Sequence, residues 1–151
     1  MQNHFQMEYS IAVSCRTHNL QKVRKFVENI LNSLLISPMD SNLVLVAIDE
    51  LCANLMLHSH YQTPSDLIEV KIREEEDGMF IFEVHDTAVE GFDPSIYEPS
   101  SIQDIIKNKS AGGMGLMLVK KIMDSIHFER KGQKNICRVC KTIKKPDIEL
   151  S

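Results

Sequence analysis

The chain has 151 residues, 43% of them hydrophobic and 25% charged, which is the composition of a globular protein with one core and not of a disordered segment. The net charge of −4 gives no overall basic field for nucleic acid, and no apolar stretch approaches the length of a membrane span. The four cysteines are scattered, and the N-terminus lacks the basic and apolar regions of a signal peptide. We therefore expect a cytoplasmic protein that forms one domain over residues 1–151 and binds neither nucleic acid nor membrane.

Hydrophobic periodicity predicts the first three elements. Alternation favours a strand over residues 7–15, and helical spacing follows over 17–36. A second helix is expected from Ser37-Pro38 to about His58, because serine can cap a helix, proline suits its first turn, and Asp40 can complete a capping box.

The second half of the chain adds strands, a long irregular segment and one more helix. Strands are expected over 67–73 and 79–86, joined by an acidic turn that ends in Asp-Gly, and over 126–131 and 136–144. Residues 87–112 carry no long periodicity, apart from a possible short helix at 102–107, and are interpreted as a lid or binding loop. A helix follows the glycines at 112–115. This order predicts an α+β fold, a two-layer sandwich with helices on one face of a mixed, mostly antiparallel sheet.

The second helix carries the first candidate site. Glu50, Asn54 and His58 are four residues apart, so they share one helix face that differs from the apolar stripe. A carboxylate can act as a base, and a carboxamide oxygen is a suitable ligand for Mg²⁺. The alternative is a polar helix edge that faces water.

The second candidate is Asp86, which follows an apolar strand containing Phe80, Phe82 and Val84. An aspartate in that place can lie at the floor of a pocket and accept a hydrogen bond from an exocyclic amine, whereas the alternative is a turn that only closes the strand.

The third candidate is the glycine-rich start of the last helix, at Gly112, Gly113 and Gly115. Glycines let the backbone approach a ligand closely, and a helix N-terminus presents free N–H groups to an anion such as phosphate. The spacing matches neither a P-loop nor a dinucleotide-binding G-x-G-x-x-G, and the alternative is a flexible hinge.

In this order, the three sets resemble the N, G1 and G2 boxes of the GHKL (Bergerat-fold) ATPases. Within that superfamily the chain is most similar to the anti-sigma factor serine kinases, which also share Phe92-Asp93-Pro94 and the stretch from Gly112 through Asp124. The resemblance covers essentially the whole chain and implies a protein kinase that uses ATP and Mg²⁺.

The resemblance also implies roles for individual residues. Glu50 would be the catalytic base, Asn54 would ligate Mg²⁺, and Asp86 would bind the adenine amine. The remaining nucleotide-binding positions would be Ala88, Phe92, Gly112, Gly113, Met114, Gly115, Leu116 and Thr142. The implied substrate is a serine of a STAS-domain anti-anti-sigma protein, the other partner is an alternative sigma factor, and the implied assembly is a homodimer.

Two alternatives stay open at this stage. The family usually has glycine where this chain has Ala88, and the stretch from Asp86 to Phe92 is one residue longer than usual. This departure leaves open a non-catalytic or weakly ATP-binding module that sequesters a partner. A domain descended from a histidine kinase is disfavoured, because no dimerisation helix with a phospho-acceptor histidine is present.

Cys137 and Cys140 match C-x-x-C, but three residues along a strand place them on opposite faces, so no metal or redox pair is expected.

Overall fold

The computed structural model describes residues 7–58, 66–76, 78–87 and 113–144. Its elements are β1 (Glu8–Ser14), a 3₁₀ turn (Thr17–Asn19), α1 (Leu20–Ser33), α2 (Pro38–His58), β2 (Leu67–Glu76), β3 (Met79–Asp86), α4 (Gly113–Ile122), β4 (Ser125–Lys131) and β5 (Lys134–Thr142). The expected lid, with its possible short helix at 102–107, lies outside the described residues apart from Thr87. None of the helices in the described ranges combines the length and apolarity needed to cross a bilayer.

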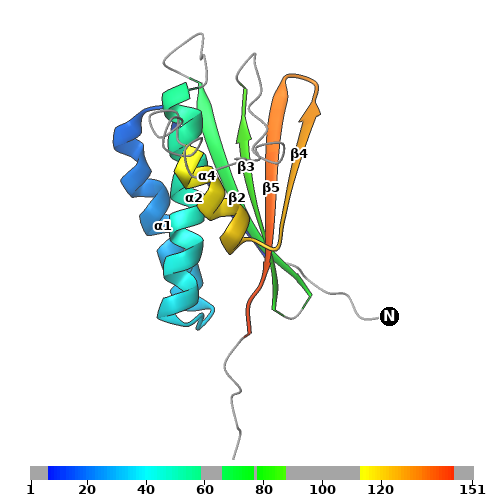
Figure 1. Cartoon of the computed structure of the whole chain (residues 1–151). Helices are drawn as coiled ribbons and strands as arrows, with labels where there is room; N and C mark the ends of the chain where they lie inside the picture. Colours follow the sequence, from blue (N-terminus) through cyan, green and yellow to red (C-terminus); the bar gives the residue numbers. More distant parts are fainter. Residues whose placement is uncertain (1–6, 59–65, 77, 88–112, 145–151) are drawn as a thin grey trace, which may run out of the picture.

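The strands of the described residues form one sheet in the spatial order β1-β2-β3-β5-β4, and every neighbouring pair is antiparallel. The α+β expectation is confirmed, and the sheet is antiparallel throughout this part of the chain. Because β5 pairs with β3 in the antiparallel direction, the first residues of β5 lie beside the last residues of β3 (Figure 1). The elements after the glycines therefore return to the point where β3 ends.

The α-helices of the described residues, α1, α2 and α4, pack on the same face of the sheet (Figure 1). Successive side chains of a strand alternate between faces, so one set from each strand enters the core. The inner strands contribute Ile68, Val70, Ile72, Phe80, Phe82, Val84, Cys137 and Val139, and the helices contribute Val23, Val27, Leu31, Val44, Ile48, Leu51, Leu55, Leu116 and Val119. Cys140 lies on the other face from Cys137, as the strand spacing predicts. This apolar layer fixes which face of α2 is left for polar residues.

At the start of α2 Ser37 is the predicted cap, but the Asp40 carboxylate accepts from the Ser37 hydroxyl and not from the Ser37 backbone N–H that a capping box would use. The backbone N–H of Asp40 donates to the Ser37 hydroxyl oxygen at 3.2 Å, and that hydroxyl donates to the Asp40 carboxylate at 3.0 Å. The first bond satisfies one of the N–H groups that have no partner in the first turn of a helix. The cap therefore marks the residue after which α2 begins.

The other face of the sheet carries charged side chains that form a continuous ion-pair ladder across the strands. In spatial order from β1 to β4 the ladder runs through Glu8, Arg73, Glu83, Arg138 and Glu129. Its inner ion pairs, at 3.2 Å and 2.7 Å, are shorter than its outer ones, at 3.9 Å and 3.8 Å. The ladder pairs the charged side chains on a sheet face that no described helix covers.

Glu83 is the centre of this ladder, and its side chain is only 8% exposed. Burial alone would raise the pKa of Glu83, but hydrogen bonds from His85, Arg138 and Arg73 outweigh it and lower the pKa from 4.5 to about 2. The carboxylate is therefore ionised at neutral pH.

Candidate active site

The polar face of α2 presents two of the predicted residues together. Asn54 is 5% exposed, and its Nδ2 donates to the backbone oxygen of Glu50 at 2.7 Å. The other end of the carboxamide, Oδ1, is buried and has no hydrogen-bond partner among the described residues. Buried carboxamide oxygens are nearly always bonded. Because this oxygen is an acceptor, it is suited to a ligand that offers positive charge, such as a cation.

The Oδ1 atom of Asn54 bears on whether the residues of this site could hold Mg²⁺. Among the described residues there is no cluster of three His, Cys, Asp or Glu side chains that could hold a metal ion. Mg²⁺ in nucleotide sites commonly takes one or two protein oxygens and completes its shell with phosphates and water. Asn54 Oδ1 supplies one such oxygen, and the residues present are therefore compatible with Mg²⁺ held jointly by the protein and a phosphate group.

The start of α4 lies directly against Glu50. A Cβ atom built on Gly115 would overlap the Glu50 carboxylate, so a side chain at this position would displace Glu50. Glycine at position 115 therefore lets the Glu50 carboxylate keep its place by close approach, and backbone conformation is not the reason. The contact joins two of the three motifs that the sequence predicted to work together, since Gly115 belongs to the first turn of α4 and Glu50 to α2.

The electrostatic surroundings of Glu50 favour a weakly acidic carboxyl group. Burial raises the pKa of Glu50, and the negative charge of Asp49 raises it further. Asp49 is itself held by Arg24 on α1 through a two-point contact, with Nε donating at 2.6 Å and Nη2 at 3.1 Å. A carboxylate with a raised pKa is a stronger base once it is ionised, which is the property that proton abstraction needs.

Asp86 ends β3 and is 4% exposed. Its Oδ1 accepts a hydrogen bond of 2.9 Å from Nδ2 of Asn135, the residue opposite it on β5. Arg130 on β4 in turn donates from Nη1 to Oδ1 of Asn135 at 2.6 Å. Asp86 is thus a buried carboxylate with a defined orientation, as a residue that recognises a ligand must be.

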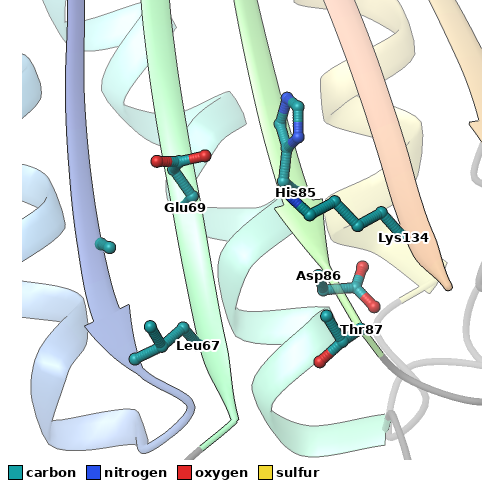
Figure 2. A pocket seen from close by; sticks show the side chains of 7 residues that line it. Leu67, Glu69, His85, Asp86, Thr87 and Lys134 are labelled. Atoms are coloured by element: carbon teal, nitrogen blue, oxygen red, sulfur yellow. The ribbon is translucent and has the colours of Figure 1, made fainter. Parts of the chain in front are cut away.

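A cavity of about 240 Å³ borders Asp86, and Figure 2 shows the side chains that line it. Glu69 and His85 lie opposite each other on β2 and β3, on the sheet face that carries the ion-pair ladder. Asp86 and Thr87 line the cavity from the end of β3 (Figure 2). The cavity therefore lies mainly on the sheet face opposite to the one against which α2, with Glu50 and Asn54, packs.

The other predicted residues lie at the start of α4, outside the described residues, or, for Thr142, at the far end of β5. Leu116 is buried in the first turn of α4, and Gly113 begins that helix. Ala88, Phe92 and Gly112 lie outside the described residues, as does the side chain of Met114.

Thr142 is not placed beside Asp86. It pairs with Met79 at the opposite end of the β3–β5 ladder, and its N–H donates to the Asp124 carboxylate at 2.7 Å. The structure instead places Asn135 next to Asp86, a residue that the sequence analysis did not single out. Its sequence neighbours Gly132 and Gln133 suggest a turn, and only the register between β3 and β5 reveals its partner.

The fold is that of a histidine kinase-like ATPase domain. The chain belongs to this family, because residues 13–141 match the histidine kinase-like ATPase domain. The resemblance to GHKL ATPases inferred from the three motifs is confirmed at this level. No curated protein sequence matches the chain.

Solved structures with the same fold share little sequence with it. The structure of the RsbU and RsbW domains of Rv1364c from Mycobacterium tuberculosis superposes with a TM-score of 0.68 at 15% identity, over 93% of this chain and 33% of that one. The histidine kinase domain of the blue-light activated histidine kinase of Erythrobacter litoralis EL346 gives a TM-score of 0.54 at 12% identity, over 87% and 62% of the two chains. The chain thus spans a third of the first protein and less than two thirds of the second, and at these identities the likeness concerns the fold.

Proposed function

We propose that the protein is an Mg-ATP-dependent serine/threonine protein kinase that acts as an anti-sigma factor and phosphorylates a serine of a STAS-domain anti-anti-sigma protein. The observation that carries the proposal is the contact between Glu50 and Gly115, which brings a candidate base to the helix N-terminus suited to hold phosphates. Family membership supports the ATP-binding part, and the fold likeness to a chain with an RsbW domain agrees with the regulatory part.

The proposed roles are those that the resemblance to the GHKL ATPases implies, and the chemistry of the groups present supports them. Asp86 accepts a hydrogen bond from the adenine amine, and Asn54 offers Oδ1 to Mg²⁺. Gly113, Gly115 and the amide of Leu116 bind phosphate oxygens, and we assign Gly112 and Met114 to the same segment and Ala88 and Phe92 to the adenine side. Bound Mg²⁺ supplies positive charge that neutralises the phosphates.

The proposed reaction needs one proton acceptor. The substrate hydroxyl oxygen forms a bond to the γ-phosphorus while the bond from that phosphorus to the β–γ bridging oxygen breaks, and ADP leaves. Glu50 receives the hydroxyl proton. Its raised pKa suits this step, because the carboxylate is a stronger base than an exposed glutamate. The remaining catalysis comes from holding the hydroxyl and the γ-phosphate together.

The partners follow from the same proposal. Besides its STAS-domain substrate, the kinase would bind an alternative sigma factor. We also propose a homodimer and a cytoplasmic location.

The decisive experiment has two stages. Calorimetric titration of ATP with and without Mg²⁺ is expected to give saturable one-site binding that Mg²⁺ strengthens. Transfer of labelled phosphate to a STAS-domain protein encoded nearby is then measured for the parent and for Glu50→Ala, which should abolish transfer and leave ATP affinity within a few-fold of the parent. Equal transfer rates in both proteins would refute the role of Glu50.

The same two stages separate the kinase from a partner-sequestering module. ATP binding without transfer to any STAS-domain protein would refute the kinase activity and favour the module. Failure to bind at millimolar ATP would refute nucleotide binding itself.

A further inference from the structure

Asp86 is the buried end of a short hydrogen-bonded relay that crosses three strands. Arg130 on β4 donates to Asn135 on β5 at 2.6 Å, and Asn135 donates to Asp86 on β3 at 2.9 Å. Asn135 is 1% exposed and Asp86 4%, so these bonds form away from bulk water, where hydrogen bonds to charged groups are strong. Arg130, by contrast, is an exposed residue at the rim of the sheet.

The chemistry of the two outer groups determines how the Asn135 carboxamide is oriented. A guanidinium group can only donate hydrogen bonds, and an ionised carboxylate can only accept them. Asn135 must therefore turn its oxygen to Arg130 and its NH₂ group to Asp86. If Arg130 were absent, the carboxamide would lose one of the two contacts that select this orientation over the flipped one.

The relay also acts on the carboxylate without neutralising it. Asn135 carries no charge, and it donates one hydrogen bond to an oxygen of Asp86. A carboxylate offers about four acceptor positions, so one bond from Asn135 fixes the plane of the group and leaves it an acceptor. A fixed acceptor distinguishes a base with an amino group from a base that presents a carbonyl oxygen at the same position.

We propose that Asn135 and Arg130 are positioning residues that set the base specificity of the nucleotide site by holding Asp86 as an oriented hydrogen-bond acceptor. This inference rests on the proposed function, because it takes the ligand of Asp86 to be the base of a nucleotide. It assigns discrimination between adenine and other purines to two residues that do not touch the base, of which the outer one lies on the protein surface.

The test is a ratio of affinities measured by equilibrium binding. ATP is compared with purine riboside triphosphate, which lacks only the 6-amino group. The parent is expected to prefer ATP by about 10- to 100-fold, the range for one hydrogen bond to a charged group. Asn135→Ala should reduce the preference to within about 3-fold, and Arg130→Met should reduce it partway. A purely structural defect would weaken both nucleotides equally and leave the ratio unchanged.

Two control variants match these substitutions. Asn19 is also a buried asparagine, 4% exposed, and it donates to Ser14 on β1, so Asn19→Ala tests loss of a buried carboxamide elsewhere. Lys131 neighbours Arg130 on the same strand and is exposed, so Lys131→Met tests loss of a surface cation. Both controls are expected to keep the parental ratio.

The outcomes separate this inference from the proposed function. A parent that fails to bind ATP refutes both. A parent that binds ATP but does not prefer it over the 6-deamino nucleotide refutes this inference alone, as does an Asn135→Ala variant that keeps the parental ratio. If Asn135→Ala does not fold, the exposed Arg130→Met decides the matter, because an unchanged ratio in that variant overturns the relay.

Discussion

Replacing Glu83 by glutamine is expected to destabilise the protein by about 3 kcal/mol at pH 7. The pKa of Glu83 is lowered from 4.5 to about 2 in the folded protein, and this difference corresponds to about 3 kcal/mol at about 1.4 kcal/mol per pH unit. The side chain is only 8% exposed, which places Glu83 among buried ion pairs. Removing one partner of a buried ion pair costs a similar amount, about 3–5 kcal/mol.

The pH dependence gives this prediction a sign. Because the folded-state pKa lies below the unfolded one, the stabilisation is present in full above about pH 4.5 and is lost as the pH falls to about 2. The parent should therefore lose this stability between pH 4.5 and 2, whereas the free energy of unfolding of Glu83→Gln should vary less over that range.

Urea unfolding followed by circular dichroism at pH 7, 4 and 3 measures both effects. Glu75→Gln is the matched control, since Glu75 lies on β2 and forms a 3.2 Å ion pair with Arg73 but is 39% exposed. It should lose at most about 1 kcal/mol. Equal stability of Glu83→Gln and the parent at pH 7, or parallel pH dependences, would refute the reasoning.

Three further predictions concern the candidate site. Asn54→Ala should abolish the strengthening of ATP binding by Mg²⁺, and calorimetry with and without Mg²⁺ would contradict this if the Mg²⁺ effect persisted. Gly115→Ala should displace the Glu50 carboxylate and lower phosphate transfer by at least about 100-fold, comparable to losing a general base, and an unchanged transfer rate would show that the contact is not needed. Because the pKa of Glu50 is raised, transfer should fall on acidification at a higher pH than an exposed glutamate would give, and a pH–rate profile flat down to pH 4 would exclude Glu50 as the base.

Most of the fold could be predicted because each element has a strong local signal. The alternation of Phe80, Phe82 and Val84 identifies β3 and the face it buries, and the cap at Ser37 identifies the start of α2. The element order then favours an antiparallel sheet with helices on one side. The bounds were less accurate at polar strand ends, since β2 continues to Glu76 and β5 begins at Lys134, two residues before the predicted start.

The site could be predicted only where its residues carry a spacing. Glu50 and Asn54 share a helix face by periodicity alone, and Gly115 belongs to a recognisable glycine cluster. Asn135 has no such signal, because its role depends on β5 inserting between β3 and β4, a long-range register that local pattern does not encode. The same register explains why Thr142 lies far from Asp86, since the two residues occupy opposite ends of neighbouring antiparallel strands.

The ion-pair ladder also constrains how the sequences of related proteins can vary. Glu83 receives hydrogen bonds or ion pairs from two arginines on different strands, at 3.2 Å and 2.7 Å, so a change at position 83 leaves both Arg73 and Arg138 without their shared carboxylate. Positions 73, 83 and 138 are therefore expected to change together among relatives, in spite of their distance along the sequence. Glu8 and Glu129, at the ends of the ladder, have longer contacts and more exposed side chains, and substitutions there need no compensating partner.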